Sequence, residues 1–108
     1  MKQPRLPCFV LPSAADDLNI EVSYLLETAG ETVALRFSHA VEQSLNLIAD
    51  FPQMGTLCSA FALPASSLRW KPLTNRFSRW LVFYRVTPDR IEIVRILGGE
   101  RDLQSLLK

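Results

Sequence analysis

The sequence predicts an α+β fold in which a helical hairpin packs on a small antiparallel sheet. Three observations support this prediction: an apolar run near the amino terminus, helical periodicity over residues 13–50, and three strand-like runs within residues 68–97. Helices and strands are thus segregated along the chain, which is typical of this fold class. At 108 residues the chain fits one domain, 1–108, because a core of this size already removes roughly two-thirds of the unfolded surface from water.

The amino-terminal elements are a short strand and an amphipathic helix. Residues 8–11 form an apolar run between Pro7 and Pro12, which suits a strand near a sheet edge because an edge tolerates a missing N–H donor. Ser13, followed by Asp16 three residues later, matches a helix N-cap and first turn. The apolar residues that follow recur at helical spacing, and we expect them to form the buried stripe: Ala15, Leu18, Val22, Leu25, Leu26 and Ala29.

A second helix is expected over about residues 32–50. Only a short turn at Gly30 and Glu31 separates the two helices, so they should pack antiparallel as a hairpin. Pro52 ends the helical pattern, because proline lacks the N–H donor that a helix needs. Residues 56–67 are apolar but aperiodic, and we expect a loop there with room for one helical turn. The buried stripe of the second helix should consist of Ala34, Phe37, Val41, Leu45 and Ile48.

Three strands are expected in the carboxy-terminal half, over residues 68–73, 77–86 and 91–97. Thr74-Asn75 and Pro88-Asp89 supply the turns between them. Gly98-Gly99 ends the sheet, and residues 102–107 can form a short final helix.

Alternation along the middle strand assigns its side chains to the two faces of the sheet. One face should carry Trp80, Val82, Tyr84 and Val86, and the other Leu81, Phe83 and Arg85. We expect the aromatic residues of this strand to belong to the core rather than to stack on nucleobases. If Thr87 faces Arg90 across the turn, Arg85 lies opposite Glu92 and Tyr84 lies opposite Ile93.

The composition indicates a globular cytoplasmic protein. Cys8 and Cys58 lie in apolar surroundings without a second thiol or a histidine at metal-ligand spacing, so we expect two reduced, buried thiols and no metal. The amino terminus weakly resembles an export signal, but only four apolar residues separate Pro7 from Pro12, below the roughly 7 to 15 of such a signal. No segment approaches the roughly 20 apolar residues that span a bilayer. No cofactor is expected.

Charge is distributed unevenly along the chain. Residues 68–101 contain eight cationic and three acidic residues, a net charge of +5. Residues 1–67 contain three cationic and seven acidic residues, a net charge of −4. Because a cationic surface concentrates anionic ligands near it, the carboxy-terminal strands are expected to contact an anionic or acidic partner.

Three motifs in this half are the most specific: WLVFYRV at residues 80–86, IEIVRIL at 91–97 and the ending GERDL at 99–103. Together with the order of elements, they resemble the ParE/RelE superfamily of bacterial toxins from type II toxin–antitoxin pairs. Further matching residues are Ala15, Asp17, Leu18, Tyr24, Ala34, Phe37, the segment IADFPQMG at 48–55, and Leu68-Arg69.

The ParE branch of this superfamily fits the chain better than the RelE branch. Resemblance to ParE implies a toxin that blocks DNA gyrase and stalls replication without a catalytic step of its own. RelE-like members cleave messenger RNA on the ribosome, which requires a base, an acid and cations that stabilise the phosphate. The chain is rich in cations, but His39 is expected on the surface of the second helix, and residues 101–108 contain neither tyrosine nor histidine.

We therefore expect a non-enzymatic role with no catalytic residue. A RelE-like endoribonuclease is the alternative, and it would use Arg69, Lys71, Arg85 and Arg95 to stabilise the phosphate. A degenerate toxin that retains only antitoxin binding is a third hypothesis. For contact with gyrase or another acidic partner the candidates are Arg69, Lys71, Arg85, Arg95 and Arg101.

Some of these cations also have structural interpretations. Arg85 can pair with Glu92 across the hairpin, and Arg101 can pair with Asp102. Arg76 and Arg79 are expected to be solvated charges, outside the set of target contacts.

The resemblance also implies a cognate ParD-like or similar antitoxin, which would assemble with the toxin as a hetero-oligomer. Ile20 and Tyr24 lie one helical turn apart on a face nearly opposite the buried stripe, so they need a cover. Either the antitoxin or the chain's own Leu103, Leu106 and Leu107 could supply it. The candidates for antitoxin binding are Ile20, Tyr24, Leu103 and Leu106. Two positions depart from the pattern of the family: Gly98 stands where many ParE-like sequences have histidine, and Glu100 replaces a small residue.

Overall fold

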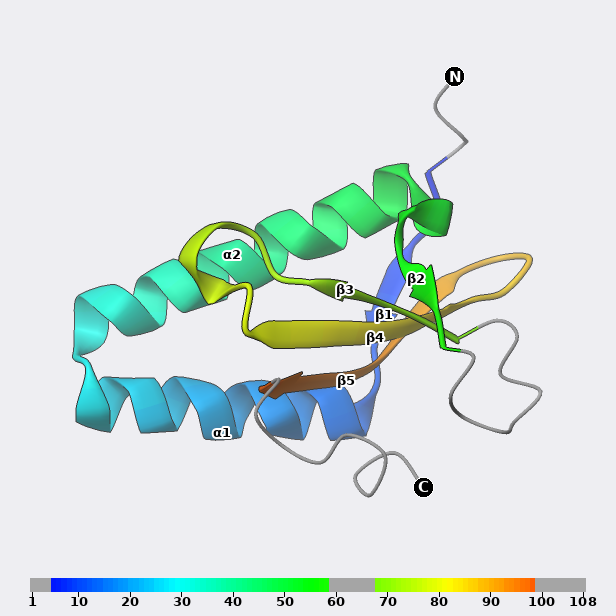
Figure 1. The fold of residues 1–108 in the computed structure, drawn as a ribbon. Coiled ribbons are helices and arrows are strands. Elements are labelled where there is room, and N and C mark those ends of the chain that lie inside the picture. Colours follow the sequence, from blue (N-terminus) through cyan, green and yellow to red (C-terminus); the bar gives the residue numbers. More distant parts are fainter. Residues whose placement is uncertain (1–4, 59–67, 99–108) are drawn as a thin grey trace.

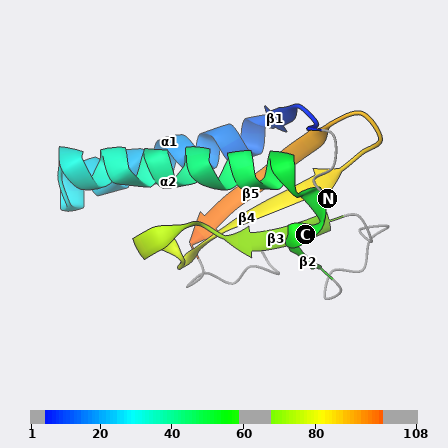
Figure 2. The same ribbon diagram turned by 90° about the horizontal axis from the view of Figure 1, so that it is seen from above.

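The computed structural model describes residues 5–58 and 68–98. Two helices lie side by side on one face of a sheet (Figure 1), and the view along the layers shows both helices on the same side of the strands (Figure 2). The α+β fold predicted from the sequence is therefore confirmed. In order, the elements are β1 Cys8–Val10, α1 Pro12–Thr28, α2 Glu31–Asp50, η1 Pro52–Met54, β2 Thr56–Leu57, β3 Leu68–Pro72, η3 Asn75–Phe77, β4 Trp80–Val86 and β5 Ile91–Gly98.

The sheet is mixed, which corrects the expectation of an antiparallel sheet. Its strands follow the order β1-β5-β4-β3-β2, in which β1 runs parallel to β5 and the other pairs are antiparallel. A parallel pair requires a long connection between its strands, and everything from α1 to β4 forms that connection here. The prediction of an edge strand near the amino terminus is confirmed. The final helix expected at 102–107 lies outside the described residues.

The segment expected to be a loop contains a short strand at its start. Thr56 and Leu57 pair with Trp70 and Arg69 as β2, at the edge of the sheet opposite β1. The rest of the expected loop, residues 59–67, lies outside the described residues. The next turn is a 3₁₀ helix, η3, so β4 begins at Trp80 rather than at Phe77. Phe77 instead turns inward and makes an edge contact with Phe37, at 5.4 Å between ring centroids.

Helix α1 begins earlier than expected and buries only part of the predicted stripe, together with two acidic residues. Leu11 rather than Ser13 is the N-cap, and no side chain caps the helix; Pro12 occupies the first turn, where an N–H partner is not needed. Of the predicted stripe, Leu25 is buried, while Leu26 is 48% exposed. The residues that α1 buries are Ala14, Asp17, Glu21 and Leu25, with Leu18 and Val22 partly buried against the core.

Helix α2 agrees closely with its prediction. It begins after Gly30, whose φ of 95° is favourable for glycine and lets the chain reverse between the helices. The predicted hairpin is therefore confirmed. Leu45 is partly buried, and the other predicted stripe residues are all buried: Ala34, Phe37, Val41 and Ile48.

The sheet separates two apolar clusters. The larger cluster lies between the sheet and the helices and includes Phe37, Ile48, Val82 and Tyr84. The smaller one contains Cys58, Phe83 and Leu97, with Leu68, Trp70 and Leu81 partly buried around it. The predicted alternation of β4 is thus confirmed, and its aromatic residues belong to these clusters.

The β4–β5 hairpin has the predicted register. Arg85 pairs with Glu92, Tyr84 pairs with Ile93, and the Thr87 N–H donates to the Arg90 carbonyl at 2.8 Å. Beyond this point the register shifts, since Phe83 pairs with Arg95 and leaves Val94 as an extra residue in β5. Such a bulge increases the local twist and redirects nearby side chains.

Tyr84 connects the middle of the sheet to the turn that follows α2. Its hydroxyl donates to the Pro52 carbonyl and accepts from the Gly55 N–H, both at 2.8 Å. A Cβ atom at position 55 would lie 2.5 Å from the Tyr84 hydroxyl oxygen. Burial raises the pKa of Tyr84, so its hydroxyl keeps the proton that it donates. The Pro-x-x-Gly segment therefore requires glycine because a tyrosine fills the space beside it.

We predict that Gly55→Ala destabilises the fold by about 1–3 kcal/mol, because the added methyl group overlaps a buried ring with little room to move. Urea denaturation monitored by circular dichroism measures this change. Gly98→Ala is the matched control, since Trp80 Nε1, the nearest atom to its added Cβ among the described residues, would lie 3.8 Å away. Equal destabilisation of the two variants would contradict the prediction.

Candidate interaction surface

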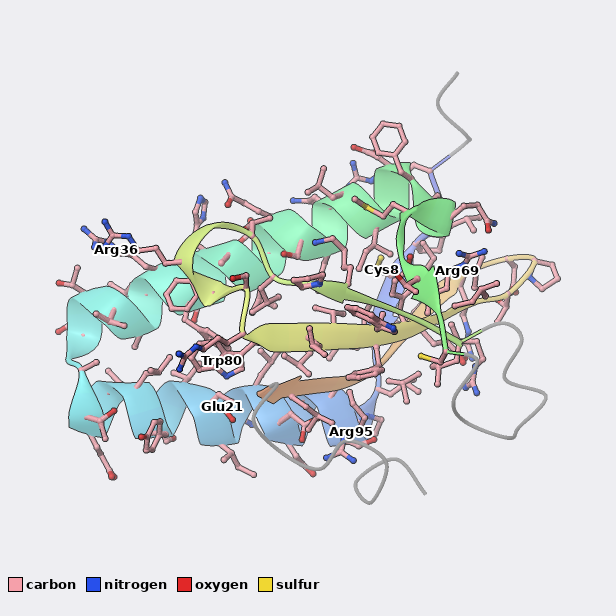
Figure 3. All side chains as sticks on the ribbon, viewed as in Figure 1. Cys8, Glu21, Arg36, Arg69, Trp80 and Arg95 are labelled. Carbon is pink, nitrogen blue, oxygen red and sulfur yellow. The ribbon has the colours of Figure 1, made fainter. Side chains whose placement is uncertain are left out.

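Arg95 is bound to helix α1. Its Nε donates to Asp17 Oδ2 at 2.8 Å and its Nη2 donates to Asp17 Oδ1 at 3.0 Å. The Ile96 N–H also donates to Asp17 Oδ2, at 3.0 Å. The hydrogen bond that Arg95 donates to Asp17 raises the pKa of Arg95, and only 22% of the Arg95 side chain is exposed. Arg95 therefore joins a helix to a strand edge (Figure 3).

Arg69 is bound to the turn that follows α2. Its Nη1 donates to the Gly55 carbonyl at 2.7 Å and to the Gln53 carbonyl at 3.2 Å, and its Nη2 donates to Gln53 Oε1 at 2.6 Å. A guanidinium has five N–H donors in a fixed plane, which suits it to several acceptors in one turn. Arg69 and Tyr84 thus hold the same Pro-x-x-Gly segment from two strands.

Arg85 and Arg90 share one carboxylate. Arg85 donates to Glu92 Oε1 at 2.9 Å through Nε, and Arg90 donates to Glu92 Oε2 at 2.6 Å. The structural interpretation of Arg85 as a cross-hairpin partner is confirmed. The hydrogen bonds that Arg85 and Arg90 donate to Glu92 lower its pKa, and the larger effect comes from Arg85. Arg90 also lies 5.2 Å from the centre of the Phe9 ring on β1, so the cluster reaches the adjacent strand.

The four cationic residues that the RelE-like alternative would use do not converge on one site. Arg69 and Lys71 pair with Tyr84 and Val82, two residues of the helix-facing cluster. Arg85 shares the opposite face with Phe83, and Arg95 lies beside α1. Lys71 donates to the Pro72 carbonyl at 2.6 Å, and partial burial lowers its pKa. Arg101, the remaining predicted contact, lies outside the described residues.

Sequence reasoning missed a hollow between α2 and η3. Its volume is about 450 Å³. Arg36, which lines it, projects from α2 on the side away from α1 (Figure 3). His39 and Arg76 are exposed, as expected, but they line this hollow together. No local sequence motif predicts this hollow, because η3 meets α2 only through tertiary packing. The lining residues are Leu35, Arg36, His39, Arg76 and Phe77.

The apolar pair on α1 is exposed as predicted. Ile20 is 59% exposed and Tyr24 is 58% exposed. The leucines proposed as a cover, Leu103, Leu106 and Leu107, lie outside the described residues. Contact of this pair with an antitoxin stays a prediction.

The two thiols are free, as expected. Cys58 is buried, whereas Cys8 is only partly buried and donates to the Leu45 carbonyl at 3.8 Å. Burial raises the pKa of both thiols. Within residues 5–58 and 68–98, no group of three or more His, Cys, Asp or Glu side chains could hold a metal ion. In the same ranges, no helix is long and apolar enough to cross a membrane.

Gly98, one of the two positions that depart from the family pattern, lies next to the indole of Trp80. Gly98 pairs with Trp80 in the sheet, and an added Cβ would lie 3.8 Å from Trp80 Nε1. That nitrogen is buried and has no hydrogen-bond partner among the described residues. A side chain with an acceptor at position 98 would therefore lie beside this donor. Glu100 lies outside the described residues.

Comparison with known proteins agrees with the resemblance seen in the sequence. Residues 9–103 match the family described as ParE toxin of type II toxin-antitoxin system, parDE. A solved chain from the chromosomal ParDE TA system of P. aeruginosa is similar, with a TM-score of 0.68 and 19% identity, over 87% of this chain and 96% of that chain. At this identity the structural match shows the fold alone. No curated protein matches the sequence significantly.

We predict that Glu92 contributes stability that is lost in acid. Because its folded-state pKa is lowered, the contribution is present above the ordinary carboxyl pKa of about 4.3 and disappears as the pH falls through the folded value. The stability difference between wild type and Glu92→Gln should therefore be largest above about pH 5 and shrink below it. Urea midpoints measured from pH 7 to pH 3 test this expectation.

Glu42→Gln is the control for this experiment, since Glu42 is exposed on α2. Its stability difference from wild type should change little with pH. A Glu92→Gln difference that is equally independent of pH would contradict the prediction.

Proposed function

Because this chain belongs to the ParE toxin family of type II toxin–antitoxin systems, we propose that it inhibits DNA gyrase, and that a cognate ParD-like antitoxin neutralises it. The observation that carries the proposal is the family match over residues 9–103, which includes both long strand motifs and the closing GERDL. The chain is a ParE-type toxin. The gyrase target and the identity of the antitoxin are the proposed parts.

The arrangement of the arginines favours binding over RNA cleavage. Phosphoryl chemistry needs cations that converge on one phosphate, together with an acid and a base within hydrogen-bond reach. Arg69, Arg85 and Arg95 lie at different places in the sheet, and each already binds an internal acceptor. These observations support a toxin that acts by occupying a surface of its target. They give the RelE-like alternative no specific support.

We predict that the purified, antitoxin-free chain inhibits the supercoiling activity of gyrase in a concentration-dependent manner. Relaxed plasmid, ATP and the gyrase heterotetramer form the assay, and the yield of supercoiled plasmid is the measurement. Primer extension on ribosome-bound messages is the parallel experiment, and it should show no cuts within codons. Gyrase that stays fully active with excess folded toxin would contradict the proposal, and cuts within codons would favour the RelE-like alternative.

We predict that replacing Ile20 and Tyr24 together with aspartate weakens antitoxin binding by about ten-fold or more, because burying two new carboxylates against an apolar partner is unfavourable. Both side chains are exposed on α1, so the fold should tolerate the change. Titration calorimetry against the antitoxin encoded beside this toxin gives the affinity.

Asn19→Asp with Ser23→Asp is the matched control for this pair. It adds the same charge to exposed positions of α1 without removing apolar surface. Antitoxin affinity should then stay close to the wild-type value. If the Ile20→Asp/Tyr24→Asp protein folds and binds antitoxin as well as the control does, the apolar pair is not the antitoxin contact.

A further inference from the structure

The cations of the hollow between α2 and η3 differ from those of the sheet. Arg69, Arg85, Arg90 and Arg95 all donate to acceptors within the chain. Arg36 and Arg76 make no hydrogen bond or ion pair with any residue in the described ranges. His39 adds a third nitrogen-bearing side chain to the same lining. These side chains are therefore available to an external anion.

The walls of the hollow are held in place by contacts beneath it. The Phe77 ring contacts Phe37 and Trp80 edge to face, at centroid distances of 5.4 Å and 5.8 Å. The Thr74 N–H donates to the Ser44 hydroxyl at 3.2 Å, which ties the start of η3 to α2. A site whose walls are fixed before binding loses less conformational entropy when a ligand enters. The hollow is preorganised in this sense.

Apolar surface accompanies the positive charge. Leu35 is 63% exposed, and the half-buried Phe77 lies in the same lining. Two guanidinium groups beside apolar side chains suit a ligand that combines anionic oxygens with an apolar group. Arginine binds carboxylates and phosphates equally well through its planar fork, so the surroundings of the hollow must decide between them.

The surroundings of the hollow favour a short acidic peptide over a nucleic acid. Glu31 lies four residues before Leu35, and Glu42 lies three residues after His39, so carboxylates occupy the same helix one turn beyond the lining on either side. A nucleic-acid strand carries a charge at every nucleotide and would pass over these carboxylates. A peptide segment can place its acidic residues only where the two arginines lie.

We propose that this hollow receives a segment of the target protein that carries two carboxylates beside an apolar side chain. This inference rests on the proposed gyrase target and adds the surface that contacts it. Arg36 points away from α1, whereas Ile20 and Tyr24 lie on α1 (Figure 3). The two proposed contact surfaces therefore lie on different helices.

The test compares the Arg36→Gln/Arg76→Gln variant of the whole 108-residue chain with wild type for binding to immobilised gyrase heterotetramer. Losing two charge-assisted contacts should weaken binding by about ten-fold or more, and the loss should shrink as salt screens the wild-type interaction. Antitoxin affinity should change by no more than roughly two-fold, because the sites are independent. Asn19→Asp/Ser23→Asp lowers the net charge by the same two units on α1 and should bind gyrase as wild type does.

Each outcome of this test has one meaning. Wild type that binds gyrase, together with an Arg36→Gln/Arg76→Gln variant that binds equally well, would overturn the inference and leave the proposed function intact. A variant that loses antitoxin and keeps gyrase would also overturn it, since the hollow would then belong to the antitoxin. Wild type that does not bind gyrase would overturn the proposed function, and the inference with it.

Discussion

The carboxylate of Asp17 is the constraint on which the arrangement of helices and sheet depends. β1 is short and pairs with Ile91–Ile93, so the rest of β5 has no neighbouring strand on that side within residues 5–58 and 68–98. Asp17 accepts the Ile96 N–H that a neighbouring strand would otherwise bind, and it binds Arg95 at the same time. A buried carboxylate is tolerated only when such partners surround it. The side chain of one helix residue thus completes the edge of the sheet and fixes the rotation of α1.

The same interaction joins the two oppositely charged halves of the sequence. The acidic first half and the cationic second half fold against each other, and Asp17 with Arg95 is a direct contact between them. Within the second half, Glu92 binds Arg85 and Arg90, while Arg69 binds the turn after α2. Many of the arginines therefore hold the scaffold together. Their roles as target contacts stay predictions, but any partner would have to compete with acceptors that are already bound.

Local patterns were sufficient to predict the two helices, the longer strands and much of the core, but not β2 or η3. The periodicity of α2, the alternation of β4 and the register set by Thr87 and Arg90 all depend on neighbours close in the sequence. The buried face of α1 was predicted only in part. Leu18, Val22 and Leu25 pack against the core as expected, but Asp17 and Glu21 are also buried, and an apolar pattern treats acidic residues as solvent-facing. The parallel pairing of β1 with β5 and the meeting of Arg36 with Arg76 depend on tertiary packing. No spacing rule within one element predicts either.

The two proposed contact surfaces differ in their physical character, and this difference bears on how a toxin could meet two partners. Ile20 and Tyr24 form an exposed apolar pair, so binding there would draw on burial of surface, which salt does not screen. The hollow instead presents Arg36 and Arg76. Their attraction for exposed carboxylates is largely screened beyond about 10 Å at 0.1 M ionic strength. Charge accelerates encounter, whereas apolar burial slows dissociation. Charge at the hollow would thus speed the capture of a target, whereas apolar burial on α1 would slow the release of an antitoxin, which suits a neutralisation that must persist.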